Sequence, residues 1–94
     1  MKARLIHRFK NITPEGDIIE AVIWKVPNPL KPSEHSYKYR MVYIVNGNRV
    51  VGFDNERGKG DHCHLDGIEQ NYDFTTVEQL MADFIVEIEK RRKQ

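Results

Sequence analysis

The sequence is poor in several features, and each shortage removes a class of protein. It has one cysteine, Cys63, so an internal disulfide is impossible and a reducing compartment is indicated. No apolar run approaches the roughly 20 residues that span a bilayer, and residues 1–8 are charged without an apolar signal core. The net charge is only +1, which argues against a protein that binds nucleic acid through a broad basic surface but allows a local basic site. We therefore expect a cytoplasmic protein with no membrane contact.

The length of 94 residues is typical of one domain, so we expect residues 1–94 to fold as a single domain. Apolar residues make up 39 % and charged residues 31 %, which indicates a globular chain rather than a disordered one. A chain this short buries about 60–65 % of its unfolded surface, which allows one modest core. Any functional site must then lie on the surface of that core or at its edge.

Segments rich in β-branched and aromatic residues alternate with turn signals, which predicts an antiparallel sheet. A turn is expected at 13–16, where proline and glycine supply the required backbone angles. The three prolines within 27–32 predict a stiff connector, because they lack backbone donors. We expect four to five strands, at about 3–10, 17–26, 38–45, 48–54 and 69–74.

The strongest turn signal is Asn46-Gly47, which favours a type I′ hairpin turn with positive φ at both residues. Counting outward from this turn pairs Val45 with Asn48, then Tyr43 with Val50, and finally Tyr39 with Asp54. Both faces of this hairpin carry apolar side chains. The hairpin is therefore expected in the middle of the sheet.

The C-terminal segment has the pattern of an amphipathic helix over about 76–91. Thr75 and Glu78 have the spacing of a capping box, with Thr75 as the N-cap. One apolar stripe follows at helical spacing: Val77, Leu80, Met81, Phe84, Ile85 and Ile88. The sequence thus predicts an α+β fold in which this helix packs on one face of the sheet.

The segment most able to carry chemistry runs from Asp54 to Asp66, with nine ionisable side chains and two glycines. It follows a hairpin strand, and loops carried by a rigid sheet are where functional residues concentrate. If the chain is extended there, His62 and His64 point to one face and Cys63 to the other, which makes Cys63 a poor nucleophile. Two imidazoles on one face can act as acid and base near neutral pH. The alternative is a solvated loop whose histidines bond the backbone.

These residue types suit a metal-independent ribonuclease. His62 and His64 would act as acid and base, one on the 2′-hydroxyl and one on the leaving 5′ oxygen. Lys59 and Arg57 would neutralise the scissile phosphate. Asp54 is expected to orient a histidine, and Asp61 is the other carboxylate that could do so.

Tyr39 and Arg40 are further candidates for RNA contact, because an aromatic ring beside a cation can stack on a base. Ordinary sheet packing is the alternative for Tyr39.

No cofactor and no resident metal is expected. A single His-x-His lacks the second ligand pair that a structural zinc site needs. A divalent-ion nuclease that uses Asp54, Asp61 and His62 remains open as an alternative.

Residues 39–45, 49–62, 72–80 and 83–84 resemble the corresponding stretches of the TumE family, and the likeness covers nearly the whole chain. Its most specific part is the block from Asp54 to His62, with the sequence Asp-Asn-Glu-Arg-Gly-Lys-Gly-Asp-His. Members of this family are small proteins classed as toxin components of toxin–antitoxin systems. The resemblance implies a toxin whose antitoxin carries a helix-turn-helix DNA-binding domain, and it strengthens the expectation that RNA is the target.

Two functions follow from these observations. The first is a type II toxin that acts on RNA as a ribonuclease. The second is a non-enzymatic module that pairs with a helix-turn-helix partner through an exposed hairpin or a free edge strand. A homodimer remains open in either case.

Overall fold

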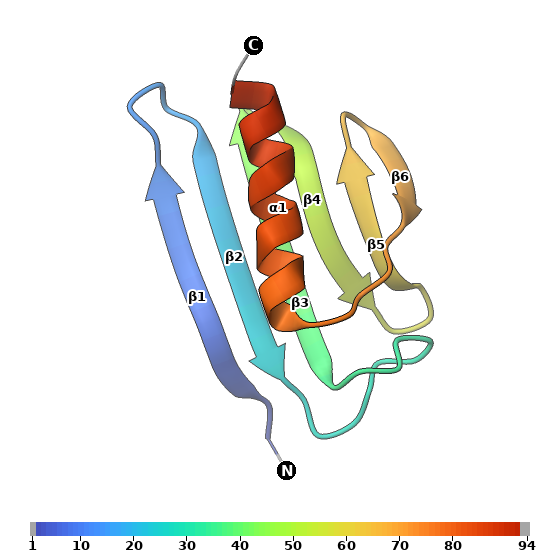
Figure 1. Cartoon of the computed structure of the whole chain (residues 1–94). Helices are drawn as coiled ribbons and strands as arrows, with labels where there is room; N and C mark the ends of the chain where they lie inside the picture. The colour runs from blue at the N-terminus through green and yellow to red at the C-terminus, as the bar shows by residue number, and fades with distance from the viewer. Residues whose placement is uncertain (1, 93–94) are drawn as a thin grey trace.

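The fold is an antiparallel sheet with one helix on one face, in a computed structural model that describes residues 2–92 (Figure 1). Neighbours in the chain are neighbours in the sheet, so each strand pairs with the next. The α+β class and the C-terminal helix predicted from the sequence are confirmed. The described elements are β1 Arg4–Ile12, β2 Ile18–Lys25, β3 Tyr37–Val45, β4 Asn48–Glu56, β5 Gly60–Leu65, β6 Ile68–Asn71 and α1 Val77–Arg92.

The described residues contain six strands, one more than the highest number expected. The extra strand is β5, which lies within the segment predicted to be a loop. Gly58 and Gly60 adopt φ of 87° and 78° and turn the chain back after β4. Asp66 and Gly67, with φ of 53° and 86°, then form a two-residue turn into β6. Asp-Gly is the same type of hairpin signal as Asn-Gly, so this turn could have been predicted.

The predicted register of the β3–β4 hairpin is right at the turn and wrong beyond it. Val45 pairs with Asn48 as expected, but Tyr43 pairs with Val51 instead of Val50. A β-bulge adds one residue to β4, and every later β4 residue therefore changes face. Asp54 consequently lies opposite Arg40 rather than Tyr39.

The physical reason for the bulge is the apolar pattern of the two strands. With the extra residue, Val51 and Phe53 of β4 lie on the same face as Met41 and Tyr43 of β3, and all four are buried against α1. A regular register would have sent the two β4 side chains to the opposite face. Burial of such side chains contributes about 1.5–3 kcal/mol each, which favours the bulged pairing.

Helix α1 begins one residue later than expected, because Thr76 rather than Thr75 is the N-cap. The Thr76 Oγ1 accepts a hydrogen bond of 3.0 Å from the backbone N–H of Gln79. Leu80, Phe84 and Ile88 form the buried side of the helix. Ile85, which the apolar stripe included, is exposed instead.

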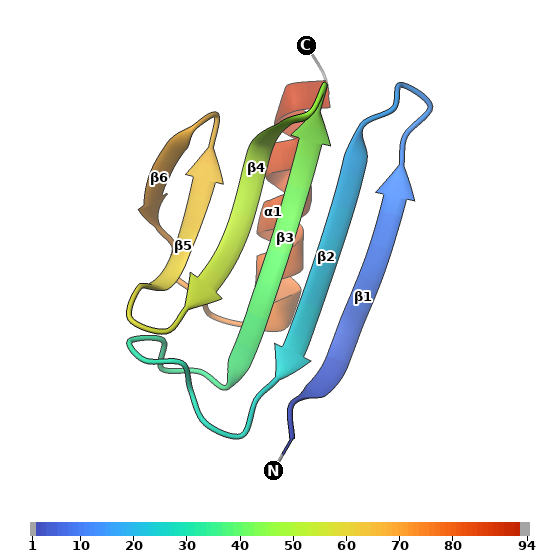
Figure 2. The same cartoon turned by 180° about the vertical axis from the view of Figure 1, so that it is seen from behind.

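The core lies between α1 and the face of the sheet that α1 covers. Figure 2 shows the opposite face, which we call the open face, with no described helix over it. Because side chains alternate along a strand, the strand residues that are not directed towards α1 lie on the open face. The core residues are Ala21, Ile23, Tyr39, Met41, Tyr43, Val51, Phe53 and Cys63 from the strands, with Leu80, Phe84 and Ile88 from the helix.

Within residues 2–92 we find no helix with the length and apolarity required to cross a membrane.

Candidate active site

A group of polar side chains lies on the open face where β4, β5 and β6 adjoin. Asp54 is directly opposite His62, and Gly52 is opposite His64. The strand alternation places both histidine rings on the open face and Cys63 in the core, as the His-x-His spacing predicted. We call Asp54, His62, His64 and their β6 neighbour Glu69 the open-face cluster.

The members of this cluster are close enough to act together. One side-chain O or N atom from each of Asp54, His62 and His64 lies within 4.8 Å of the other two. The His62 Nε2 is in direct contact with the Asp54 Oδ1. The two imidazole rings meet nearly edge to face, with centroids 5.2 Å apart.

The ring of His62 is held between two hydrogen-bond acceptors. Its Nδ1 lies 3.0 Å from the carbonyl oxygen of Gly60, and its Nε2 faces the Asp54 carboxylate. A neutral imidazole has only one N–H and can satisfy only one of these acceptors. The Asp54 Oδ1 is buried and has no partner of hydrogen-bond geometry among the described residues. Both acceptors would be satisfied by one additional positive charge, either a second proton on His62 or a bound cation.

Glu69 is a member of the cluster that the sequence analysis missed. Its Oε1 lies 3.7 Å from the His62 Nε2 and 3.8 Å from the His64 Nε2. The Lys59 Nζ contacts the same oxygen at 2.5 Å, and this hydrogen bond lowers the pKa of Glu69 and raises the pKa of Lys59. The Asp66-Gly67 turn was the available signal, because a two-residue hairpin loop there places Glu69 opposite His64.

His64 is the more accessible of the two histidines, with 17 % of its side chain exposed against 4 % for His62. Burial lowers the pKa of His64, and the nearby charge of Arg49 lowers it further. Arg49 reaches this position across Gly52, where a Cβ atom would lie 3.0 Å from the Arg49 Cδ. His64 is therefore neutral near pH 7, with a ring nitrogen lone pair that can accept a proton or bind a cation.

The comparison with known families agrees with the resemblance noted in the sequence. The family model described as Toxin TumE matches residues 2–92. The chain belongs to the TumE toxin family. It is therefore a toxin of a toxin–antitoxin system, and its family membership implies an antitoxin partner. Neither a curated protein nor a solved structure matches the chain.

The remaining RNA-contact candidates of this TumE-family toxin lie in different places. Arg40 is exposed on the open face beside Asp54, and Arg57 is exposed in the β4–β5 turn. Tyr39 is only 1 % exposed and lies on the face covered by α1. Its hydroxyl donates a 2.7 Å hydrogen bond to Asp61, and burial together with this bond raises its pKa. Tyr39 is thus placed for core packing and not for stacking on a base.

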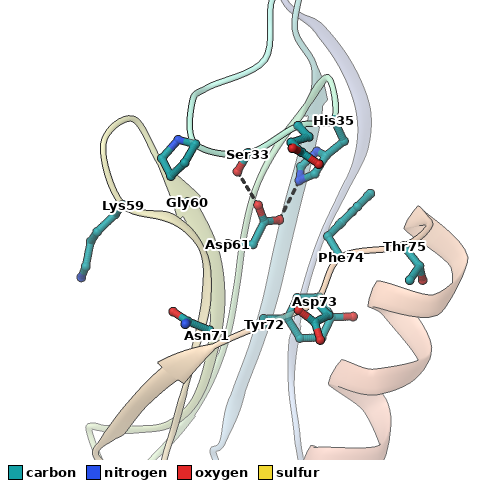
Figure 3. A pocket seen from close by; sticks show the side chains of 12 residues that line it. Ser33, His35, Lys59, Gly60, Asp61, Asn71, Tyr72, Asp73, Phe74 and Thr75 are labelled. Atoms are coloured by element: carbon teal, nitrogen blue, oxygen red, sulfur yellow. Dashed lines mark hydrogen bonds and ion pairs between the residues drawn. The ribbon is translucent and has the colours of Figure 1, made fainter.

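Asp61 belongs to a second cluster on the other side of the sheet, at a cleft of about 540 Å³ (Figure 3). Its carboxylate accepts hydrogen bonds from Ser33, from the His35 Nε2 at 2.6 Å and from the Tyr39 hydroxyl. The ring of His35 stacks on Phe74 with centroids 3.8 Å apart. We call Ser33, His35, Tyr39 and Asp61 the connector cluster, because Ser33 and His35 belong to the connector between β2 and β3.

The placement of Asp61 excludes it from a joint site with Asp54 and His62. Asp61 and His62 are consecutive strand residues, so their side chains point to opposite faces. The ligand set Asp54, Asp61 and His62 considered for a divalent-ion nuclease is therefore not formed. His35 of the connector lies beside Asp61.

Every polar group at the centre of the connector cluster has a partner. The His35 Nε2 donates to Asp61 and its Nδ1 accepts a 3.2 Å bond from the Tyr37 N–H, as one neutral tautomer allows. The buried Asn55 donates to the Tyr37 carbonyl at 2.7 Å and accepts from the Tyr39 N–H at 3.0 Å. These bonds hold the connector against β4 and β5. In the open-face cluster, by contrast, the buried Asp54 Oδ1 has no hydrogen bond among the described residues. The open-face cluster is the candidate active site of the toxin.

Proposed function

We propose that this chain is a type II toxin that cleaves RNA in the cytoplasm at the open-face cluster. The observation that carries the proposal is the meeting of Asp54, His62 and His64 on the open face, with Lys59 bound to their neighbour Glu69. Two imidazoles, a carboxylate and a cation are the groups that phosphodiester transfer by a neighbouring 2′-hydroxyl requires.

The open face also offers a path for an RNA strand. Cationic side chains of β1, β3 and β4 lie on this face, and the half-buried ring of Trp24 lies among them. Lysine and arginine neutralise phosphates, and an aromatic ring stacks on a base. A chain with a net charge of +1 can thus present a locally basic surface. The cationic residues of the open-face strands are Arg8, Lys10, Lys38, Arg40 and Arg49.

In the absence of a bound ion, His64 is the better-placed base for the 2′-hydroxyl because it is more accessible than His62. Asp54 orients the His62 ring before substrate binds. His62 would then protonate the leaving 5′ oxygen through Nε2, while the Gly60 carbonyl holds its ring through Nδ1. Lys59 and Arg57 would contact the phosphate. His62 reaches a substrate only when its contact with Asp54 opens, so this assignment gives His64 the larger role.

The test is inducible expression of the wild type beside the single variants His64→Ala and His62→Ala. We expect the wild type to arrest growth and to fragment cellular RNA, and each variant to do neither. His7→Ala is the matched control, because His7 is an exposed histidine of β1 outside both clusters. A folded His64→Ala variant that is as toxic as the wild type would contradict the proposal.

A second function, as a non-enzymatic module that binds a helix-turn-helix antitoxin, is supported by the outer edge of the sheet. All nine residues of β1 are exposed, among them Leu5, Phe9 and Ile12. An edge strand with exposed apolar side chains can accept an added strand of a partner. Arg4, Arg8 and Lys10 favour an acidic partner segment.

Substituting β1 separates the two functions. If β1 is the antitoxin surface of a ribonuclease, Phe9→Lys should weaken antitoxin binding and leave RNA cleavage intact. If the chain is only a binding module, Phe9→Lys should abolish growth arrest and His64→Ala should have no effect. Sedimentation of the wild type and of Phe9→Lys shows whether β1 pairs with a second copy of the chain instead.

A further inference from the structure

The donor atoms of the open-face cluster have the composition of a transition-metal site. Imidazole nitrogens and carboxylate oxygens are the ligands that Zn²⁺ and related ions take in proteins. Bonds of about 2.0–2.1 Å to a tetrahedral ion place neighbouring ligand atoms about 3.3 Å apart. The Glu69 Oε1 is already 3.7 and 3.8 Å from the two histidine Nε2 atoms. The donors would surround one point after small side-chain shifts that bring Glu69 closer and move the Asp54 Oδ1 away from the His62 Nε2.

The surroundings of His62 are those of a metal ligand. Histidines that bind a metal commonly donate their other ring N–H to a backbone carbonyl, which fixes the tautomer. His62 is placed to do this through Nδ1 and the Gly60 carbonyl, and in that neutral tautomer Nε2 carries a lone pair. That lone pair faces the buried Asp54 Oδ1, which lacks a hydrogen-bond partner among the described residues. A cation bound to both atoms satisfies them at once.

We infer that Asp54, His62, His64 and Glu69 form a binding site for one divalent transition-metal ion of the Zn²⁺ class. Three ligands come from the adjacent strands β4 and β5, and Glu69 comes from the edge strand β6. A hard ion such as Mg²⁺ fits less well, because it prefers oxygen ligands and retains its water.

Lys59 competes with the ion for Glu69. Its ammonium lies 2.5 Å from the Glu69 Oε1, the same oxygen that is nearest to the two histidines. Ion binding must break this contact or use the other carboxylate oxygen. Removal of the ammonium by Lys59→Met should therefore strengthen ion binding several-fold.

This inference deepens the proposed function and rests on the same site, but ion binding does not require that the chain cleaves RNA. It accounts for the burial of His62, which is a disadvantage for a proton donor and suits a ligand. An ion held by Asp54, His62, His64 and Glu69 would supply Lewis-acid stabilisation of the charge that develops on the phosphate.

The test is calorimetric titration of the chelator-treated full chain with Zn²⁺, with Mg²⁺ as the comparison ion. We expect one Zn²⁺ per chain and at least tenfold weaker binding in His64→Gln and in Glu69→Gln. Glu69 is 42 % exposed on a short edge strand, so Glu69→Gln should fold even if another variant does not. His7→Gln is the matched control and should bind Zn²⁺ like the wild type.

Two results would overturn the inference. One is a wild type that binds no Zn²⁺, which would mean that a second proton on His62 satisfies Asp54. The other is Zn²⁺ binding that survives in both His64→Gln and Glu69→Gln. RNA cleavage measured with and without a chelator keeps the two proposals apart. Cleavage without ion binding would leave the ribonuclease standing alone, and ion binding without cleavage would leave the metal site standing alone.

Discussion

The two aspartate–histidine clusters of this toxin lie on opposite sides of β5 and use the same residue types for different ends. In the connector cluster, Asp61 receives three hydrogen bonds and both ring nitrogens of His35 have a suitable partner. In the open-face cluster, both ring nitrogens of His62 face acceptors and the Asp54 Oδ1 has no hydrogen bond among the described residues. A buried network in which every polar group is hydrogen-bonded stabilises a fold, whereas a buried polar group without a hydrogen bond can bind a ligand.

Asp61 and His62 are neighbours in the sequence, yet each belongs to a different cluster. The alternation of a β-strand sends one to the connector and the other to the open face. The comparison therefore predicts that changes at the two clusters affect different properties, stability on one side and chemistry on the other.

The largest expected effect is on the RNA cleavage that we propose for the open-face cluster. His64→Gln should lower the cleavage rate by about 10²–10⁴-fold, because it removes an acid–base group or a ligand of a catalytic ion. The free energy of unfolding should change by less than about 1 kcal/mol, since within residues 2–92 the nearest charged partner of His64 is Glu69 at 3.8 Å, beyond hydrogen-bond distance. The cleavage rate is measured with purified protein and a radiolabelled RNA, and the free energy of unfolding is measured by urea titration. A loss of stability as large as the loss of activity would erase the distinction between the clusters.

The next effect is on stability through the connector cluster. Asp61→Ala leaves Ser33, His35 and Tyr39 without their common acceptor, and it should reduce the free energy of unfolding by about 3 kcal/mol. Asp54→Ala is the matched change in the open-face cluster and should alter stability by less than about 1 kcal/mol. Urea unfolding of the two variants checks this. Equal losses would show that both carboxylates have structural roles.

A smaller effect concerns Tyr39 at alkaline pH. Its pKa is raised by burial and by Asp61, so in the folded state the phenol stays neutral where the unfolded chain ionises. This contribution to stability is complete below the ordinary tyrosine pKa of about 10 and is lost as the pH rises above it. Tyr39→Phe should cost about 1–2 kcal/mol at pH 7 and flatten the loss above pH 10. An unchanged alkaline slope in this variant would exclude Tyr39 as its source.

The smallest effect concerns the hairpin that delivers Glu69 to the open-face cluster. Gly67 has φ of 86°, so Gly67→Ala should cost about 1 kcal/mol of stability and weaken Zn²⁺ binding a few-fold. Gly16→Ala has a similar backbone cost in the β1–β2 turn, with φ of 90°, but should leave Zn²⁺ binding unchanged. Thermal unfolding and calorimetry compare the two. Equal Zn²⁺ affinities would show that the β6 hairpin does not position a ligand.

Local sequence determined much of the architecture. The Asn46-Gly47 turn, the apolar stripe of α1 and the spacing of His62 and His64 each depend on neighbours a few residues away. The α+β class and the shared face of the two histidines follow from these periods alone. The Asp66-Gly67 turn carried the same kind of information, and with it β6 and Glu69 lay within reach of sequence reasoning.

The tertiary structure decided which side chains meet. Asp54 reaches the open face only because a bulge in β4 shifts the register, and the bulge exists because Val51 and Phe53 must be buried with Met41 and Tyr43. The same long-range packing buries Tyr39 and brings His35 to Asp61, 26 residues away. Short sequence patterns specify which way a side chain points within its own strand. The register between strands is set by the total apolar surface buried against α1, which no short segment contains.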